Sequence, residues 1–300
     1  MATDSIRALA DNADIRRGIL LVVAATLLWA SSDVMVKLLV RDYAIVQVLW
    51  VRYVVFFGFA LVLAGRRFGR RLFATQMPKA QLGRGLLTLG NNVLVIYAFS
   101  LMPLADVAAI LAVGPLIVTA LSVPFLGETV GPRRWAAVAV GFAGVLLILR
   151  PGFGVFDPVA LAPLAGAVFF AGYQLLTRVV GRVDAPPTSL LYMSAIGLAG
   201  SSLVVPFHWT TPAVAADWGL FAAAAGISVV AHGLFIKALT LAPASAVQPF
   251  NYCVLAWSIP MGWLVFAQFP DAPTLAGAAV VVASGLYTFH RERVRAAHAR

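Results

Sequence analysis

IYAFSLMPLADV at residues 96–107 returns as IKALTLAPASAV at residues 236–247. Ile, Ala, Leu, Pro and Val recur in register between the two segments. The same offset of 140 residues, give or take one, aligns LLWASSDVMVKLLV from Leu27 with VFFAGYQLLTRVVG from Val168. Each copy is a series of apolar stretches, so the sequence predicts a duplicated membrane unit. Internal repeats in polytopic membrane proteins are typical of transporters whose site lies at the repeat interface.

The composition supports a membrane protein. Hydrophobic residues make up 61% of the chain, charged residues make up 11%, and the mean hydropathy is +0.92. A soluble domain of 300 residues needs far more polar surface, so the bilayer must be the solvent for most of this chain. The single cysteine, Cys253, excludes a disulfide framework. We find no HExxH, P-loop, clustered Cys/His or Gly-x-Ser-x-Gly motif, and therefore expect no cofactor, no metal site and no coupling to ATP.

Apolar stretches of about 20 residues are long enough to cross the hydrocarbon core. Arg16 and Arg17 precede the first of these stretches, an arrangement that a signal peptide also shows. That run continues to Val40 without a small-x-small cleavage pattern, so we expect a retained helix. The sequence predicts an all-α membrane protein with ten transmembrane helices at residues 18–40, 44–65, 81–101, 104–124, 132–149, 158–180, 187–207, 214–240, 243–267 and 272–290.

The basic residues are distributed unevenly between the two faces. With the amino terminus in the cytoplasm, only Arg41 and Arg150 lie outside, and Lys37 and Arg52 fall within spans. This bias fits the positive-inside rule and places both termini in the cytoplasm of an inner-membrane protein. The net charge of +10 is therefore explained by the basic residues that set the orientation in the membrane, and we expect no nucleic-acid partner. The inner segments hold 18 of the 22 Lys and Arg residues: Arg7, Arg16, Arg17, Arg66, Arg67, Arg70, Arg71, Lys79, Arg84, Arg133, Arg134, Arg178, Arg182, Lys237, Arg291, Arg293, Arg295 and Arg300.

The ten spans divide into two units of five. We predict a first repeat at residues 18–149 and a second at 158–290, with cytoplasmic tails at 1–17 and 291–300. Because five is odd, the second copy enters the membrane from the opposite face and forms an inverted repeat. A pseudo-twofold axis in the membrane plane lets the two halves exchange inward and outward shapes, which is the basis of alternating access.

The segment GETVGPRRWAAVAVGFAGVLLILRPG from Gly127 resembles the EamA-type branch of the drug/metabolite transporter superfamily. ALTLAPASAV and FPDAPTLAGAAVVVASGLYTFHRER match the same pattern in the second half, although Ala267-Gln268 replaces Gly127-Glu128. The resemblance implies a ten-helix secondary carrier. It also implies a central cavity lined by the first four helices of each repeat, with the fifth helix peripheral. SDVMVK from Ser32 and FPD from Phe269 look like those of S-adenosylmethionine uptake carriers, and riboflavin carriers and amino-acid or metabolite exporters occur among the relatives.

Ionisable side chains at membrane depth are costly and usually face the bundle interior, so they are the first site candidates. Asp33 and Lys37 share a helix face at i,i+4 spacing, and Arg52 falls at nearly the same depth. In a binding site, Arg52 or Lys37 would take a carboxylate or phosphate, and Asp33 a cationic group or a proton. The alternative is a structural ion pair that ties the first span to the second.

Other polar residues lie near mid-membrane. Asn91 and Asn92 lie in the third span, and the offset pairs Asn92 with His232 in the eighth. These side chains can hydrogen-bond a solute, and His232 can carry a coupling proton; alternatively they join packed helices. Tyr173 and Gln174 match Ser32 and Asp33, which makes the site charged toward the outside and neutral toward the inside. The ninth span adds three candidates around a proline kink: Gln248, Asn251 and Tyr252.

We therefore expect a secondary carrier of a small polar metabolite: an amino acid or derivative, or an S-adenosylmethionine-like or flavin-like solute. An intramembrane enzyme with an Asp33/His232 pair is the main alternative. A channel is disfavoured because the polar residues cluster near mid-depth instead of forming a continuous stripe.

Small residues in the fifth and tenth spans also suit either a homodimer or packing within one chain. Aromatic residues that could stack on a flat ligand, or serve as packing, are Trp29, Tyr97, Tyr192, Trp257 and Trp263.

Overall fold

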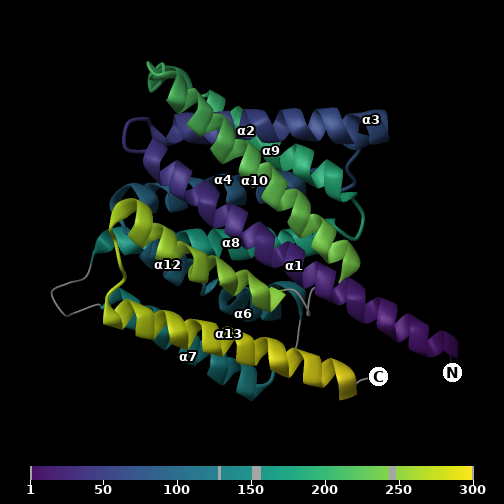
Figure 1. The fold of residues 1–300 in the computed structure, drawn as a ribbon. Coiled ribbons are helices and arrows are strands. Elements are labelled where there is room, and N and C mark those ends of the chain that lie inside the picture. Colours follow the sequence, from purple (N-terminus) through teal and green to yellow (C-terminus); the bar gives the residue numbers. More distant parts are fainter. Residues whose placement is uncertain (1, 128–129, 151–156, 243–247, 299–300) are drawn as a thin grey trace.

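The computed structural model describes residues 2–127, 130–150, 157–242 and 248–298 (Figure 1). All regular structure within these ranges is helical, which confirms the expected fold class. Glu128 and Pro243, used in the sequence comparison, lie outside the described residues. The helices are α1 (Ala2–Leu39), α2 (Ile45–Phe59), α3 (Gly65–Phe68), α4 (Pro78–Leu101), α5 (Leu104–Leu111), α6 (Gly114–Leu126), α7 (Pro132–Leu149), α8 (Leu161–Val180), α9 (Pro186–Ser202), α10 (Ala215–Leu241), α12 (Cys253–Phe266) and α13 (Ala272–His298).

Nine helical segments of the described chain are long and apolar enough to cross a membrane. The ninth span expected from the sequence, 243–267, consists of a 3-10 turn at Gln248–Tyr252 followed by α12, and its first five residues lie outside the described ranges. The fourth span is interrupted between α5 and α6, where Pro115 cannot donate the backbone hydrogen bond that would continue α5. The expected carboxyl-terminal tail is helical as far as His298.

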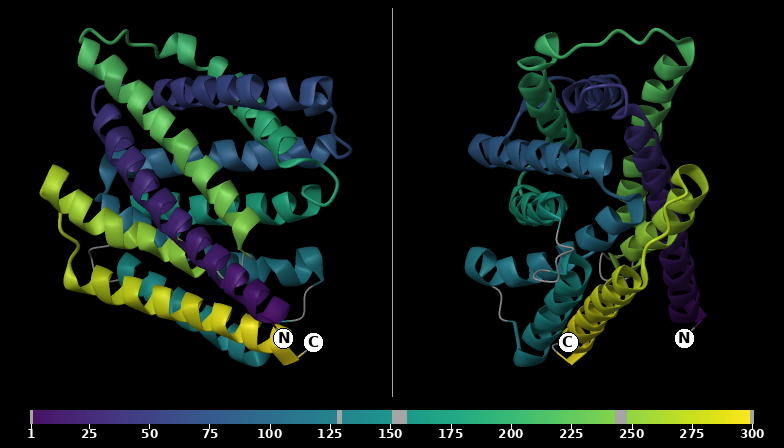
Figure 2. Two further views of the ribbon diagram at one scale, coloured as in Figure 1. Left: turned by 45° about the vertical axis from the view of Figure 1, so that its right-hand side comes forward. Right: turned by 90° about the vertical axis from the view of Figure 1, so that its left-hand side faces the viewer.

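The long helices form two layers joined at their edges (Figure 1). The front layer contains α1 packed on α10 and α12, and the rear layer contains α8 packed on α4 and α6. At one edge α2 packs on α9, and at the opposite edge α7 packs on α13. The start of α1 and the end of α13 lie at the same end of the bundle, as Figure 2 also shows. This arrangement agrees with an even number of crossings.

The 140-residue offset exchanges the two layers. It carries α1 onto α8, α4 onto α10, and the broken α5–α6 span onto the turn and α12. Each packing pair in the front layer therefore has its counterpart in the rear layer: α1 on α10 corresponds to α8 on α4, and α1 on α12 corresponds to α8 on α6. The edge pairs α2–α9 and α7–α13 map onto themselves. This pattern is what a pseudo-twofold axis between the layers requires.

The α7–α13 pair is held close by two glycines. A Cβ on Gly144 would lie 2.8 Å from the carbonyl oxygen of Gly277, and a Cβ on Gly277 would lie 2.6 Å from that of Gly144. The two backbones thus touch where neither residue has a side chain. Gly144 and Gly277, two of the small residues in the fifth and tenth spans, therefore pack against each other within one chain, and the homodimer stays a prediction.

Candidate functional site

Asp33 of α1 is the central feature of the candidate site. Its carboxylate has no hydrogen bond and no ion pair within the described chain, and the charge of Arg52 on α2 acts on it. The neighbouring Ser32 hydroxyl donates to the Ala224 carbonyl of α10 at 3.0 Å and fixes α1 at this depth. An ionisable group within a membrane-spanning helix is costly to insert, so a carboxylate without a protein partner is available to a solute or a proton.

Arg52 faces the space between α1, α2 and α10. One guanidinium nitrogen donates to the Ser228 hydroxyl at 3.0 Å, and the guanidinium lies 5.7 Å from the Phe56 ring centroid. The Arg52 side chain lines a cavity of about 10 Å³, which is room for one water molecule. Arg52 can therefore donate further hydrogen bonds, but a metabolite would need the helices to separate.

Lys37 does not pair with Asp33. Its Nζ donates to the carbonyl oxygens of Phe99, at 2.8 Å, and Met102, and it lies 5.3 Å from the Phe266 ring centroid. These carbonyls end α4, where the last turn has no helical donors of its own. A cation at a helix carboxyl terminus is favourable, so Lys37 joins α1 to α4 as a structural cap.

His232 of α10 makes two contacts through one nitrogen. Its Nδ1 lies 2.8 Å from the Ser228 carbonyl oxygen and 3.2 Å from the indole nitrogen of Trp29. The first contact requires a protonated Nδ1 and the second requires an unprotonated one, so a given tautomer satisfies only one of them. The rings of Trp29 and Phe56 pack edge-on against His232, at 5.2 and 5.1 Å between centroids. The protonation of His232 thus decides whether the Trp29 N–H has a partner.

The rear layer supplies amide groups and a second arginine. Asn92 of α4 donates to the Tyr53 hydroxyl at 2.8 Å, and Asn91 lies 3.5 Å from the Asn92 side-chain oxygen. Arg84 of α4, which the sequence places at the inner end, is buried, with 2% of its surface exposed. Its guanidinium lies 5.4 Å from the centroid of the Tyr173 ring and donates a hydrogen bond to the Ser189 carbonyl.

Gln174 of α8, at the position matching Asp33, has no hydrogen bond within the described chain. The two offset-related positions are thus a carboxylate and an amide, both available to a solute. The charge asymmetry of the site that the sequence indicates stays a prediction.

The ninth-span candidates lie in the turn before α12, and that turn packs on α1, α12 and α13. A Cβ on Gly285 of α13 would lie 1.8 Å from the Tyr252 hydroxyl, so the Tyr252 ring points at α13. Asn251 belongs to the same 3-10 turn, and Gln248 begins it. This placement suits a packed kink, which is the alternative to the binding role expected from the sequence.

A set of contacts that we call the outer clamp joins the two halves at the end assigned to the outside. The Tyr43 hydroxyl donates to Asp217 at 2.6 Å. The Gln47 amide donates to the Thr210 carbonyl at 2.7 Å and accepts from the Thr210 N–H at 2.9 Å. The hydrogen bond to Asp217, burial and nearby carboxylates raise the pKa of Tyr43 to about 12. The outer clamp therefore consists of three hydrogen bonds divided between two unconnected pairs.

The inner clamp joins the halves at the opposite end through three hydrogen bonds to one carboxylate. Asp184, in the loop between α8 and α9, accepts from the Thr75 hydroxyl, the Gln76 N–H at 3.0 Å and the Gln81 amide at 2.8 Å. Burial opposes ionisation, but these hydrogen bonds and the charge of Arg84 hold the pKa of Asp184 below its ordinary value. The offset gives a hint of these clamps: it carries Ala44, beside Tyr43, onto Asp184.

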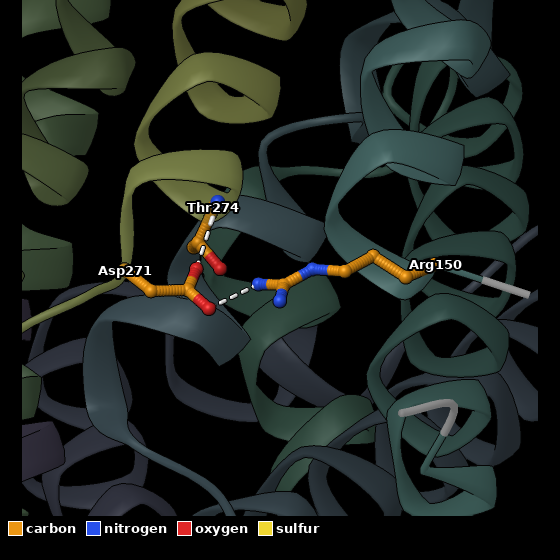
Figure 3. A network of polar contacts seen from close by, with 3 residues as sticks. All are labelled: Arg150, Asp271 and Thr274. Atoms are coloured by element: carbon orange, nitrogen blue, oxygen red, sulfur yellow. Dashed lines mark hydrogen bonds and ion pairs between the residues drawn. The ribbon is translucent and has the colours of Figure 1, made fainter. Parts of the chain in front are cut away.

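A third link between the halves lies at the outer end of the peripheral pair (Figure 3). Arg150, the cap residue after α7, forms an ion pair with Asp271, and Asp271 also accepts from the Thr274 N–H at 3.0 Å at the start of α13. The hydrogen bond from Arg150 lowers the pKa of Asp271. Both side chains are partly exposed, so this link is a surface ion pair.

Residues 16–150 match the model of the EamA-like transporter family. The chain carries an EamA-family domain. It is 33% identical over 183 residues to a riboflavin transporter of Vibrio cholerae, an alignment that spans 61% of each protein and so less than two thirds of that relative. It is 28% identical over 267 residues to an S-adenosylmethionine uptake transporter of Rickettsia felis, spanning 88% of this chain and 89% of the relative.

A pseudopaline exporter of Pseudomonas aeruginosa is 26% identical over 273 residues, spanning 89% of this chain and 94% of its own. A solved crystal structure superposes with a TM-score of 0.59 at 21% identity and covers 89% of this chain and 94% of the other, which supports the fold. The family and the named relatives together indicate a membrane transporter of small metabolites.

Proposed function

We propose that this chain is a secondary carrier of the inner membrane that moves a small zwitterionic metabolite by alternating access. The observation that carries the proposal is the Asp33 carboxylate, which has no partner within the described chain although it lies in a membrane-spanning helix. Asp33 would hold a cationic group of the solute, and Arg52 would hold a carboxylate. The two opposite charges select a solute that carries both.

The aromatic residues beside this pair narrow the solute class. Trp29, Phe56 and His232 form contiguous edge-on contacts, and Arg52 lies against Phe56. Aromatic faces stabilise organic cations and stack on flat rings. Amino-acid derivatives with a sulfonium or heteroaromatic group therefore fit this site best, in agreement with the S-adenosylmethionine and riboflavin transporters among the relatives.

The two clamps support alternation. Both join the first half of the chain to the second, one at each end of the bundle, and both are closed in this structure. A solute can reach Asp33 from one side only when the clamp on that side opens. We therefore propose that this conformation is occluded, and that the layers related by the offset separate at one clamp at a time.

An intramembrane enzyme would require Asp33 and His232 to act together. His232 instead contacts Ser228 and Trp29 through Nδ1, and Asp33 makes no hydrogen bond within the described residues. The geometry therefore favours the carrier.

The test uses purified protein in proteoliposomes. Thermal-shift screening against amino acids, S-adenosylmethionine and riboflavin identifies ligands, and counterflow measures exchange of the hits. We expect Asp33→Asn and Arg52→Gln each to abolish counterflow with folding intact, because each removes one charge from the site. Asp14→Asn on the same helix and Arg182→Gln on an exposed loop are the matched controls, and both should retain exchange. Retained exchange in both site variants would refute the charged site.

A further inference from the structure

A groove on the outer face of the α7–α13 pair lies away from the proposed solute site. It has a volume of about 450 Å³ and lies open along the two helices. Val140 of α7 and Tyr287 of α13 are about half exposed along its walls, and Ala136 and Ala283 are exposed between them. In a membrane-spanning pair, this face meets lipid.

The floor of the groove offers hydrocarbon contacts and no hydrogen bonds. Ser284, the polar residue of the floor, donates its hydroxyl to the Val280 carbonyl of its own helix at 2.7 Å. Beneath it, a Cβ on Gly141 would lie 3.3 Å from the Ser284 Cβ and 2.0 Å from a Leu116 methyl group. The floor is thus closely packed and apolar, and an acyl chain fits it better than a polar molecule does.

One end of the groove is basic. The helices run antiparallel, because Gly144 lies beside Gly277 and Gly141 lies beside Ser284. The start of α7 therefore lies beside the end of α13. Arg133 is exposed at this end of the groove, and α13 continues there into the basic sequence HRERVR from His290. The positive-inside distribution assigns this end to the cytoplasm.

We propose that the groove binds one anionic phospholipid of the cytoplasmic leaflet. An acyl chain would lie between Val140 and Ala283, and the phosphate would meet Arg133. Basic pockets between membrane helices on the cytoplasmic side are suited to anionic head groups. A second copy of this chain is the less favourable occupant, because a twofold contact through this face would bring two basic ends together.

The test compares lipids that differ only in head-group charge. Wild-type protein in a neutral detergent is heated with phosphatidylglycerol or with phosphatidylcholine of the same chains, and native mass spectrometry counts the bound lipids. We expect phosphatidylglycerol to raise the unfolding midpoint by at least about 3 °C more than phosphatidylcholine does, with one molecule retained. Inorganic phosphate alone should have no effect, because it lacks the chain that fills the groove.

Substitutions in the groove separate the contribution of the lipid head group from that of the acyl chain. Arg133→Gln should remove the preference for phosphatidylglycerol, Arg133→Lys should keep most of it, and Arg182→Gln should leave it unchanged. Ala136→Trp fills the groove and should abolish retention of either lipid. Equal stabilisation by the two lipids, or an unchanged preference in Arg133→Gln, would overturn the proposal. So would disulfide-linked dimers of a Val140→Cys variant in a Cys253→Ala background, which would identify a second copy as the occupant.

Discussion

The outer and inner clamps both join the two halves of the chain, but with different chemistry. At the outer end, a phenol meets a carboxylate and, separately, an amide pairs with a peptide group. At the inner end, a single carboxylate, Asp184, receives a hydroxyl, a peptide N–H and an amide. The three hydrogen bonds of the inner clamp thus share one acceptor, whereas those of the outer clamp are divided between two pairs. The Arg84 guanidinium and the Tyr192 hydroxyl also bond across the inner end, to the carbonyls of Ser189 and Phe73. Loss of one residue should open the inner end more than the outer end.

The largest effect should come from Asp184→Asn. The asparagine keeps one acceptor oxygen but presents N–H groups to donors, so at least one of the three hydrogen bonds is lost and another becomes repulsive. In a Cys253→Ala background we expect labelling of Thr188→Cys, which is 3% exposed in the wild type, to rise roughly tenfold in inside-out vesicles. Asp157→Asn is the matched control at the opposite end. Unchanged labelling would show that Asp184 does not hold this end closed.

A smaller effect is expected for Tyr43→Phe. It removes the hydrogen bond to Asp217 but leaves the Gln47–Thr210 pair in place. Labelling of Ala224→Cys, 5% exposed beside Arg52, should rise about threefold in right-side-out vesicles. Tyr97→Phe, a similar change at an exposed tyrosine, should have no effect. A rise as large as that for Asp184→Asn would contradict the distributed outer clamp.

A third comparison asks whether every link between the halves acts as a gate. Arg150→Gln removes an exposed ion pair, so we expect a loss of about 0.5 kcal/mol in unfolding free energy and no change in labelling at either end. Asp271→Ala should cost more, about 1 kcal/mol, because it also removes the hydrogen bond to the Thr274 N–H that caps α13. Denaturant unfolding in detergent measures both. Increased labelling of Ala224→Cys in Arg150→Gln would mean that the Arg150–Asp271 link also controls access from the outer end.

The smallest expected effect is the response of the closed clamps to moderate pH. Because the pKa of Asp184 is lowered, its contribution is complete above the ordinary carboxyl pKa and is lost only as pH falls below that range. Because the pKa of Tyr43 is raised to about 12, its contribution is complete below the ordinary tyrosine pKa near 10 and is lost as pH rises toward 12.

Between about pH 5 and 9, labelling at both cysteines, taken relative to that of a fully exposed cysteine at the same pH, should therefore be constant in the absence of solute. A change at Thr188→Cys within this window would mean that another titrating group controls the inner end.

The sequence predicted the helices well because their signals are local. The length of each apolar run set the spans, and prolines marked the turns, including the α4–α5 turn at Pro103. The interruption at Pro115 was visible but was not recognised, because the run from Leu104 is apolar throughout.

The site was less predictable, since its contacts join distant segments. Asp33 and Lys37 do share a helix face, but the long lysine side chain reaches the end of α4, which the spacing along α1 cannot show. Asp184 and Tyr43 looked like ordinary loop residues. Their partners become visible only when the segments that connect the helices are packed against each other. From the sequence, Arg84 is one of the basic residues of the cytoplasmic side, and only the packing of α4 against α9 shows that it bonds to Ser189.

The bare backbone contact between Gly144 and Gly277 has a mechanical consequence. Neither helix can rotate or slide far at this contact, because a backbone carbonyl would collide with the neighbouring helix. We therefore expect α7 and α13 to move as one rigid unit when the other helices shift. The added methyl group of Gly144→Ala would clash with the Gly277 carbonyl and push the two helices apart at their crossing. We expect this substitution to change how the two halves move relative to each other, although it contacts neither Asp33 nor either clamp.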